Sequence, residues 1–294
     1  MPSLDGATLH LGAVGNSIVY AGLATLLGVI IGVAAVTSSA AAFGLLAAAW
    51  AGVFTQFFWG FMEMQLYRAL YADHTAAFPM RLTALGNYIW LRQALFAMLN
   101  TWSAENELFD SVLSGNIAYE LCRPVGIYGM WCSRTAALRT SRAALRCLPI
   151  LVFSFLLPAP WGMTLPVSAI AFAEFLLSLL LAVGVTCAFT LILYFSCFYT
   201  VSSDGIRAVV APVVSILSGE LLPLPFLPDG LAQILNVSPF GAMMNAPLRI
   251  YGGDIAGAEA ASMLALQAFW LIAMVALGKF MQVKGMKKLA IVGG

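Results

Sequence analysis

The sequence predicts an all-α integral membrane protein, and three observations support this fold class. Of the 294 residues, 62% are hydrophobic and 9% are charged, whereas a typical soluble domain has about 25% charged residues. Apolar stretches of about 20 residues, the length of a membrane-spanning helix, recur along the chain. Most basic residues fall between alternate stretches, which is the pattern of a cytoplasmic membrane face.

The first 40 residues form a hydrophobic segment that is distinct from the rest. No acidic or basic side chain except His10 occurs between Gly6 and Met62. Residues 15–36 are apolar enough to cross the membrane as an extra span, or to lie at its inner surface as an elbow. Hydropathy alone leaves both placements open.

A six-helix membrane domain is expected over residues 41–294. The first span, at residues 42–66, ends in an aromatic cluster typical of a membrane interface. A polar loop at residues 67–82 faces outward in this topology. The second span, at residues 82–102, returns the chain to the cytoplasm.

Residues 103–126 form a polar island that opens a cytoplasmic loop spanning residues 103–143. Ser103 is placed to cap a helix, because acidic residues follow in its first turns, where the helix dipole favours negative charge. Apolar residues recur every three to five positions, and Gly115 offers a bend. An amphipathic surface helix is therefore expected here, followed by the basic residues Arg123, Arg134, Arg139, Arg142 and Arg146.

The second half of the chain continues this alternation. Spans are expected at residues 144–157 and 167–199, with a proline-rich outer turn between them and the inner turn VSSDGIR after them. The next span, from residue 208, gives way to a proline-rich, re-entrant region at residues 219–259 on the outer face. The last span, at residues 260–281, ends in a basic tail. Both termini are thus expected in the cytoplasm, with the chain in the inner (plasma) membrane.

Four charged residues fall inside the predicted spans, where ionisable groups are costly and usually meet a partner or a cavity. Glu63 and Arg92 lie on consecutive antiparallel spans, so they are expected either to pair or to line a translocation path. Glu174 and Glu220 fall in the outer halves of their spans, which is also compatible with a position at the interface. No cluster of histidine or cysteine suggests a metal site.

Several motifs occur together in a recognisable order: GNIAYELCRP in the cytoplasmic loop, LPLPFLP after the fifth span, APLRIYGG before the sixth, and the basic tail. Over residues 42–294 this set resembles the permease subunits of type-2 ATP-binding-cassette (ABC) exporters. The resemblance implies six spans, an N-terminal elbow helix and a cytoplasmic coupling helix. It also implies a second permease, identical or paralogous, and a dimer of ATPase subunits. One departure is that residues 15–36 are almost wholly apolar, whereas the family's elbow helices are amphipathic.

The chain has no G-x-x-x-x-G-K-[ST] loop for nucleotide phosphates. ATP and magnesium are therefore expected on partner ATPase subunits, with no cofactor in this chain. The polar face of the island is the expected ATPase contact, as opposed to an ordinary solvated helix, and comprises Glu105, Glu107, Asp110, Asn116, Glu120 and Arg123.

The function expected from these features is that of a permease that forms a substrate path in an ATP-driven exporter. A non-transporting membrane scaffold and an intramembrane enzyme are the alternatives, although neither HExxH nor G-x-S-x-G occurs. Membrane lipid is an expected neighbour, and nucleic acid is not, because the net charge is only +1. The mostly apolar spans favour a lipid-like, peptide or drug-like substrate.

Overall fold

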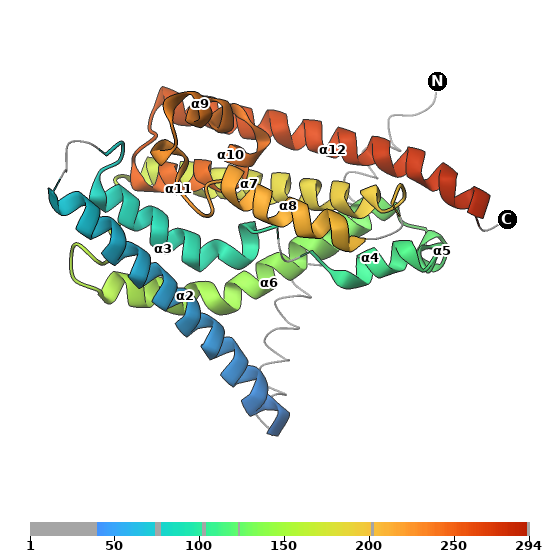
Figure 1. The fold of residues 1–294 in the computed structure, drawn as a ribbon, viewed down its shortest axis with the longest axis horizontal. Coiled ribbons are helices and arrows are strands. Elements are labelled where there is room, and N and C mark those ends of the chain that lie inside the picture. The colour runs from blue at the N-terminus through green and yellow to red at the C-terminus, as the bar shows by residue number, and fades with distance from the viewer. Residues whose placement is uncertain (1–39, 74–77, 102–103, 123, 201–202, 293–294) are drawn as a thin grey trace.

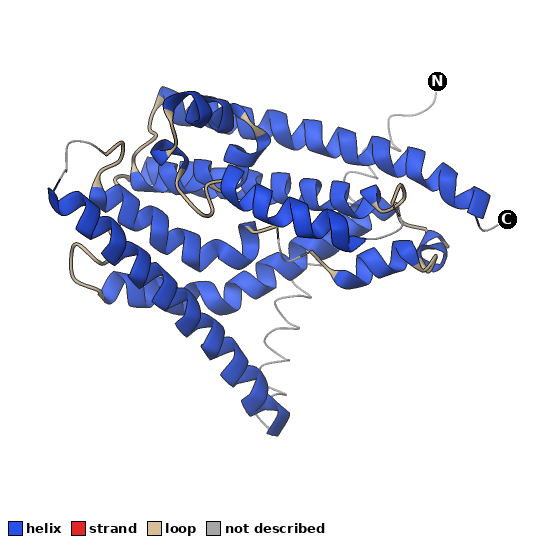
Figure 2. Ribbon diagram, in the orientation of Figure 1, coloured by secondary structure: helices blue, strands red, loops and turns tan. Residues whose placement is uncertain are grey.

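The computed structural model describes residues 40–73, 78–101, 104–122, 124–200 and 203–292. Within these ranges, every regular element is a helix (Figure 2). The all-α prediction is therefore confirmed for the described part of the chain. The predicted elbow or extra span at residues 15–36 lies outside it.

Each apolar stretch that the sequence analysis assigned to a span forms one helix of a bundle (Figure 1). The α7 and α12 helices pack along each other, α6 packs against α3, and α2 packs against both α3 and α6. The N-terminal half of α2 diverges from the bundle. These helices are α2 (Ala40–Asp73), α3 (Leu82–Leu99), α6 (Ile127–Leu156), α7 (Ala169–Ser196), α8 (Ser203–Leu217) and α12 (Ala258–Val292).

Two segments within this bundle, Ala169–Ser196 and Ala258–Lys287, are long and apolar enough to cross a membrane. The α8 helix differs, because it has only 15 residues and contains Pro212. At about 1.5 Å per residue it is roughly 22 Å long, shorter than a hydrocarbon core of about 30 Å. The fifth predicted span is therefore not one continuous crossing helix.

Three helix boundaries differ from the sequence prediction. The α6 helix begins at Ile127, so residues 127–143, assigned to the cytoplasmic loop, are helical. No glycine or proline interrupts residues 130–148, and their alanines, leucines and arginines favour a helix. The predicted inner turn VSSDGIR is helical from Ser203 onward, and α2 continues to Asp73 through part of the predicted outer loop.

The predicted re-entrant region at residues 219–259 is a series of short helices, as its prolines suggested. The last of these pieces, α11, packs against both α7 and α3 and buries Leu248 and Ile250. Gly253 caps its C-terminal end, with a φ of 72° that is readily adopted only by glycine. The series consists of a 3₁₀ turn (Leu224–Phe226), α9 (Asp229–Val237), α10 (Pro239–Met243) and α11 (Asn245–Gly252).

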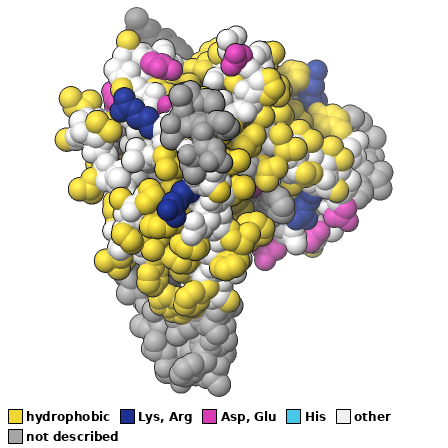
Figure 3. Space-filling model, turned by 60° about the vertical axis from the view of Figure 1, so that its left-hand side comes forward, with side chains coloured by type: hydrophobic (Ala, Val, Ile, Leu, Met, Phe, Trp, Pro, Cys, Tyr) yellow, Lys and Arg dark blue, Asp and Glu magenta, His cyan; other side chains and the backbone are white. Residues whose placement is uncertain are grey.

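Large apolar side chains cover much of the bundle's outer surface (Figure 3). Phe58 on α2, Leu180 on α7 and Ile272 on α12 are 62%, 69% and 70% exposed. A soluble protein rarely leaves so many large apolar side chains on contiguous helix faces. The surface matches a surrounding of lipid better than one of water.

A buried polar cluster joins α7 and α12. Ser178 donates its hydroxyl proton to Oε1 of Gln267 over 2.8 Å, and Nε2 of Gln267 donates to the carbonyl of Ala242 over 2.9 Å. Ser178, Ala242 and Gln267 are fully buried. One amide side chain thus links α7, α10 and α12 where apolar packing alone would leave their relative register weakly defined.

Replacement of this amide tests the link. We expect Gln267→Leu to lower the free energy of unfolding by about 1–2 kcal/mol, because two buried groups lose their partners. The measurement is thermal or denaturant unfolding of the purified protein. Gln282→Leu on the same helix is the control and should change stability little, because the hydrogen bond of Gln282 is to Met286, one turn along the same helix. Equal effects of the two variants would contradict the role of Gln267.

Candidate functional site

The polar island forms two short helices, α4 (Asn106–Leu113) and α5 (Ile117–Leu121). They lie at the end of the bundle opposite the α6–α7 loop, where α12 also ends (Figure 1). The bend between them is at Gly115, whose φ is 76°. The predicted start differs, since Glu105 has an extended backbone and the helix begins at Asn106; Ser103 lies outside the described residues.

The apolar face of α4 and α5 is buried against the bundle. Leu108, Phe109 and Ile117 are at most 2% exposed and pack in one cluster with Trp131 of α6 and Tyr194 of α7. The rings of Phe109 and Tyr194 meet edge to face with their centroids 4.7 Å apart. The backbone N–H of Glu105 also donates to the Tyr194 hydroxyl over 2.7 Å. The surface helices are thus seated firmly on α6 and α7.

Arg134 of α6 bridges two of the predicted ATPase-contact residues. Its Nε donates to Glu105 over 2.8 Å, and its Nη2 pairs with Glu107. Partial burial opposes the charge on Arg134, but the two carboxylates outweigh this effect, so the pKa of the guanidinium is raised. Glu105 itself is buried. It therefore fastens α4 to α6, and little of its side chain is left exposed for the predicted contact with a partner.

The other predicted contact residues differ in their placement. Glu107, Asp110 and Asn116 are exposed, whereas Glu120 is half-buried and accepts a hydrogen bond from Nε1 of Trp131. Arg123 lies outside the described residues. Sequence reasoning missed Tyr119, which is 78% exposed. Its position between Asn116 and Glu120, on the polar side of IAYEL, was the available signal.

Arg139 is a second residue that the sequence did not single out. Only 1% of it is exposed, and its guanidinium donates to the backbone carbonyls of Met98 and Asn100 and to the Thr190 hydroxyl. The two carbonyls belong to the C-terminal end of α3, where the helix dipole favours a positive charge. Arg139 thereby joins α3, α6 and α7 at the C-terminal end of α3, from which the chain continues to α4.

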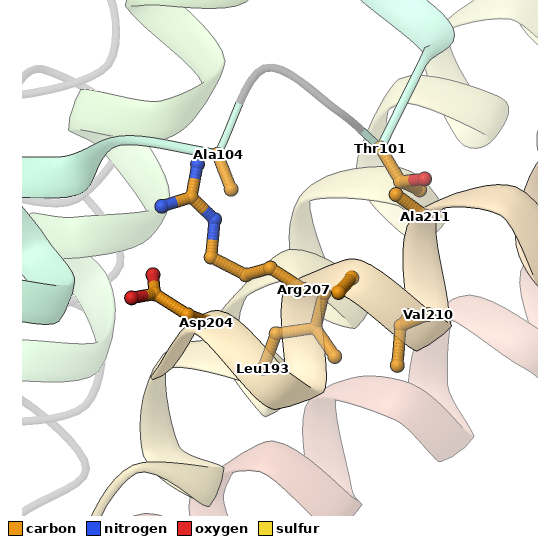
Figure 4. Close-up of a pocket in the computed structure, with 8 residues that line it drawn as sticks. Thr101, Ala104, Leu193, Asp204, Arg207, Val210 and Ala211 are labelled. Carbon is orange, nitrogen blue, oxygen red and sulfur yellow. The ribbon is translucent and has the colours of Figure 1, made fainter. Parts of the chain in front are cut away.

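A groove of about 410 Å³ lies between the start of α8 and the connection from α3 to α4 (Figure 4). Thr101 and Ala104 line it on one side, and Asp204 and Arg207 of α8 line it on the other. The Arg207 guanidinium lies 5.1 Å from the centre of the Phe109 ring, within cation–π distance. The α4 helix therefore contacts α8 as well as α6 and α7.

A larger cavity of about 740 Å³ lies between α2, α3 and the far end of α8. Glu63 and Arg92, the pair expected from neighbouring antiparallel spans, form an ion pair in its wall. Gln93 lies within hydrogen-bonding reach of Glu63. Apolar and aromatic residues form most of the remaining lining, among them Trp59, Met62, Leu66, Tyr67, Phe96, Leu221 and Leu222.

Glu220 reaches the same cavity from the turn that follows α8. It lies within hydrogen-bonding reach of Ser215 and close enough to Arg92 for their charges to attract. Glu174, in contrast, is half-buried on α7 and does not line this cavity. The structure therefore brings together three of the four charged residues predicted at membrane depth.

Comparison with protein-family models, with curated proteins and with solved structures gave no match for this chain.

The Glu63–Arg92 pair yields a testable expectation. Glu63→Gln and Arg92→Gln should each lower the free energy of unfolding by about 3 kcal/mol, because each leaves an unpaired buried charge. The double variant should lose less than the sum of the two. A double-mutant cycle on the purified protein measures this coupling, and simple additivity would show that the two residues act independently.

Proposed function

We propose that this chain is the transmembrane permease subunit of an ATP-driven ABC exporter. The observation that carries the proposal is the bent amphipathic pair α4–α5. Its apolar face is seated on α6 and α7, and its acidic and aromatic face is left exposed at one end of a helical bundle. A helix that transmits motion from a partner needs both features, a rigid seat and a free polar face.

The motifs behind the family resemblance fall at features that suit this role. GNIAYELCRP covers α5 and the approach to α6, LPLPFLP covers the 3₁₀ turn after α8, and APLRIYGG covers α11. Each motif coincides with a break in the helical bundle, where backbone groups need specific partners. This agreement supports the resemblance to type-2 ABC exporter permeases.

The distribution of charge supports an orientation with α4–α5 in the cytoplasm. Arg134, Arg207 and Lys284 belong to the helix ends near α4–α5, whereas Arg68 and Arg249 belong to the opposite end. The chain lies in the inner (plasma) membrane in this account, with both termini in the cytoplasm. Its exposed apolar helix faces then contact lipid or a second permease, identical or paralogous.

A mechanical route connects α4–α5 to the charged cavity. Partner ATPase subunits bind ATP and magnesium and move against α4–α5 as they close. Arg134 and Tyr194 pass this displacement to α6 and α7, and Arg207 passes it to α8. The far end of α8 carries Ser215, which lines the cavity. A shift of α8 therefore changes the cavity wall, as alternating access requires. A purely structural scaffold would have no need of such a cavity.

Substitution of the exposed face tests the coupling role. The double variant Asp110→Lys/Tyr119→Ala should insert and fold normally, because both side chains are exposed. It should bind its ATPase at least about tenfold more weakly, since losing a charge-assisted contact at an interface costs about 2 kcal/mol or more. The measurement is capture of a Walker-motif ATPase by the tagged chain from native membranes, quantified by mass spectrometry.

The matched control is Glu259→Lys, which reverses an exposed charge at the opposite end of the bundle. It should leave ATPase capture unchanged. Wild-type capture by the Asp110→Lys/Tyr119→Ala variant, at both low and high salt, would remove α4–α5 as the coupling surface. Failure of the wild-type chain to capture any such ATPase would remove the exporter proposal itself.

A further inference from the structure

We propose that the cavity between α2, α3 and the end of α8 binds a lipophilic organic cation. This inference rests on the proposed function, since the cavity would then be part of the substrate path. The charges and apolar surfaces that line the cavity indicate the class of substrate.

The lining carries more acidic than basic groups. Two carboxylic acids, Glu63 and Glu220, face one guanidinium, that of Arg92. Arg92 forms its ion pair with Glu63, and Glu220 makes no ion pair with any described residue. The Glu220 carboxyl group, which lies within reach of the Ser215 hydroxyl and near Arg92, is therefore the acid available to pair with an entering cation.

The acidic groups are also the ones that an entering molecule meets. Arg92 is only 5% exposed, and its Nη1 atom is closed off from solvent. The Glu63 side chain is 17% exposed, and Glu220 is half-buried. An anion would face two carboxylates before it reached the guanidinium. A cation would meet a favourable charge at the cavity surface.

The remaining wall suits an apolar body attached to that cation. Trp59, Met62 and Leu221 are large, partly exposed and placed around the charged groups. Aromatic ring faces such as that of Trp59 attract cations as well as apolar surface. A carboxylate at membrane depth is costly, and a bound cation lowers that cost, whereas a neutral lipid would not. A volume of about 740 Å³ is also within the range of small-molecule sites.

Two probes of the same size and shape isolate the charge: tetraphenylphosphonium, a lipophilic cation, and tetraphenylborate, its anionic counterpart. Binding is measured on the full-length protein in nanodiscs by equilibrium dialysis, with empty nanodiscs subtracted. We expect saturable binding of tetraphenylphosphonium and none of tetraphenylborate. Glu220→Gln should weaken cation binding by about tenfold, the effect of losing about 1.4 kcal/mol.

Two further variants keep the test decisive. Asp229→Asn, an exposed acid on the neighbouring α9, should bind the cation like the wild type. Ser215→Trp should abolish binding by filling the cavity while Glu220 is kept. Cation binding by Glu220→Gln equal to that of the wild type would overturn the proposal. A preference of the wild type for tetraphenylborate would also overturn it, and this second test does not depend on how well Glu220→Gln folds.

The same preparation separates this inference from the exporter proposal. Cation binding needs no ATPase, and Glu220→Gln should still capture the ATPase through α4–α5. Absence of cation binding by the wild-type protein, with intact ATPase capture, would overturn only the substrate class. Cation binding without ATPase capture would overturn the exporter role and leave a cation-binding membrane protein.

Discussion

The buried guanidinium of Arg139 determines how the helical bundle meets its surface helices. Arg139 is a residue of α6, and its guanidinium lies at the C-terminal end of α3. It donates hydrogen bonds to the carbonyls there and to the hydroxyl of Thr190 on α7. A buried charge is tolerated only where several acceptors surround it. Here the negative end of the α3 dipole supplies most of them. Because the chain leaves α3 at this point and enters α4 a few residues later, the Arg139 joint fixes the starting position of α4–α5 relative to three helices at once.

This constraint supports the proposal that the exposed face of α4–α5 receives motion from partner ATPases. A surface helix that is attached only by its own connections would move without the bundle, and a push on it would be lost. Aromatic packing of Phe109 against Tyr194 and the Arg134 bridge continue the attachment that Arg139 begins. The contact of Arg207 with Phe109 extends it to α8, which is short, contains a proline, and ends at the charged cavity.

The sequence predicted what depends on local pattern. Apolar stretches located the long helices. Gly115 located the bend, because the backbone there has a positive φ that glycine adopts readily. Glu63 pairs with Arg92, because neighbouring antiparallel helices bring the two residues to the same depth. What it missed depends on tertiary contact. Arg139 belongs to a run of arginines that is typical of a solvated basic segment, yet it is buried. Glu105 and Glu107 look equivalent in the sequence, but in the structure Glu105 is buried beside Arg134 and Glu107 is exposed. The convergence of Glu220 on Arg92 likewise follows from the path of the turn after α8, which periodicity does not encode.

The central claim is that the Arg139 joint makes α4–α5 a rigid part of the bundle. Backbone hydrogen exchange on Arg139→Lys tests it most directly, because lysine keeps the charge and loses the planar fork that reaches several acceptors. The account predicts faster exchange in the end of α3, in α4 (Asn106–Leu113) and in the start of α6 together, with α11 unchanged. Faster exchange confined to the end of α3, with α4 still fully protected, would show that α4–α5 is held independently and would contradict the account.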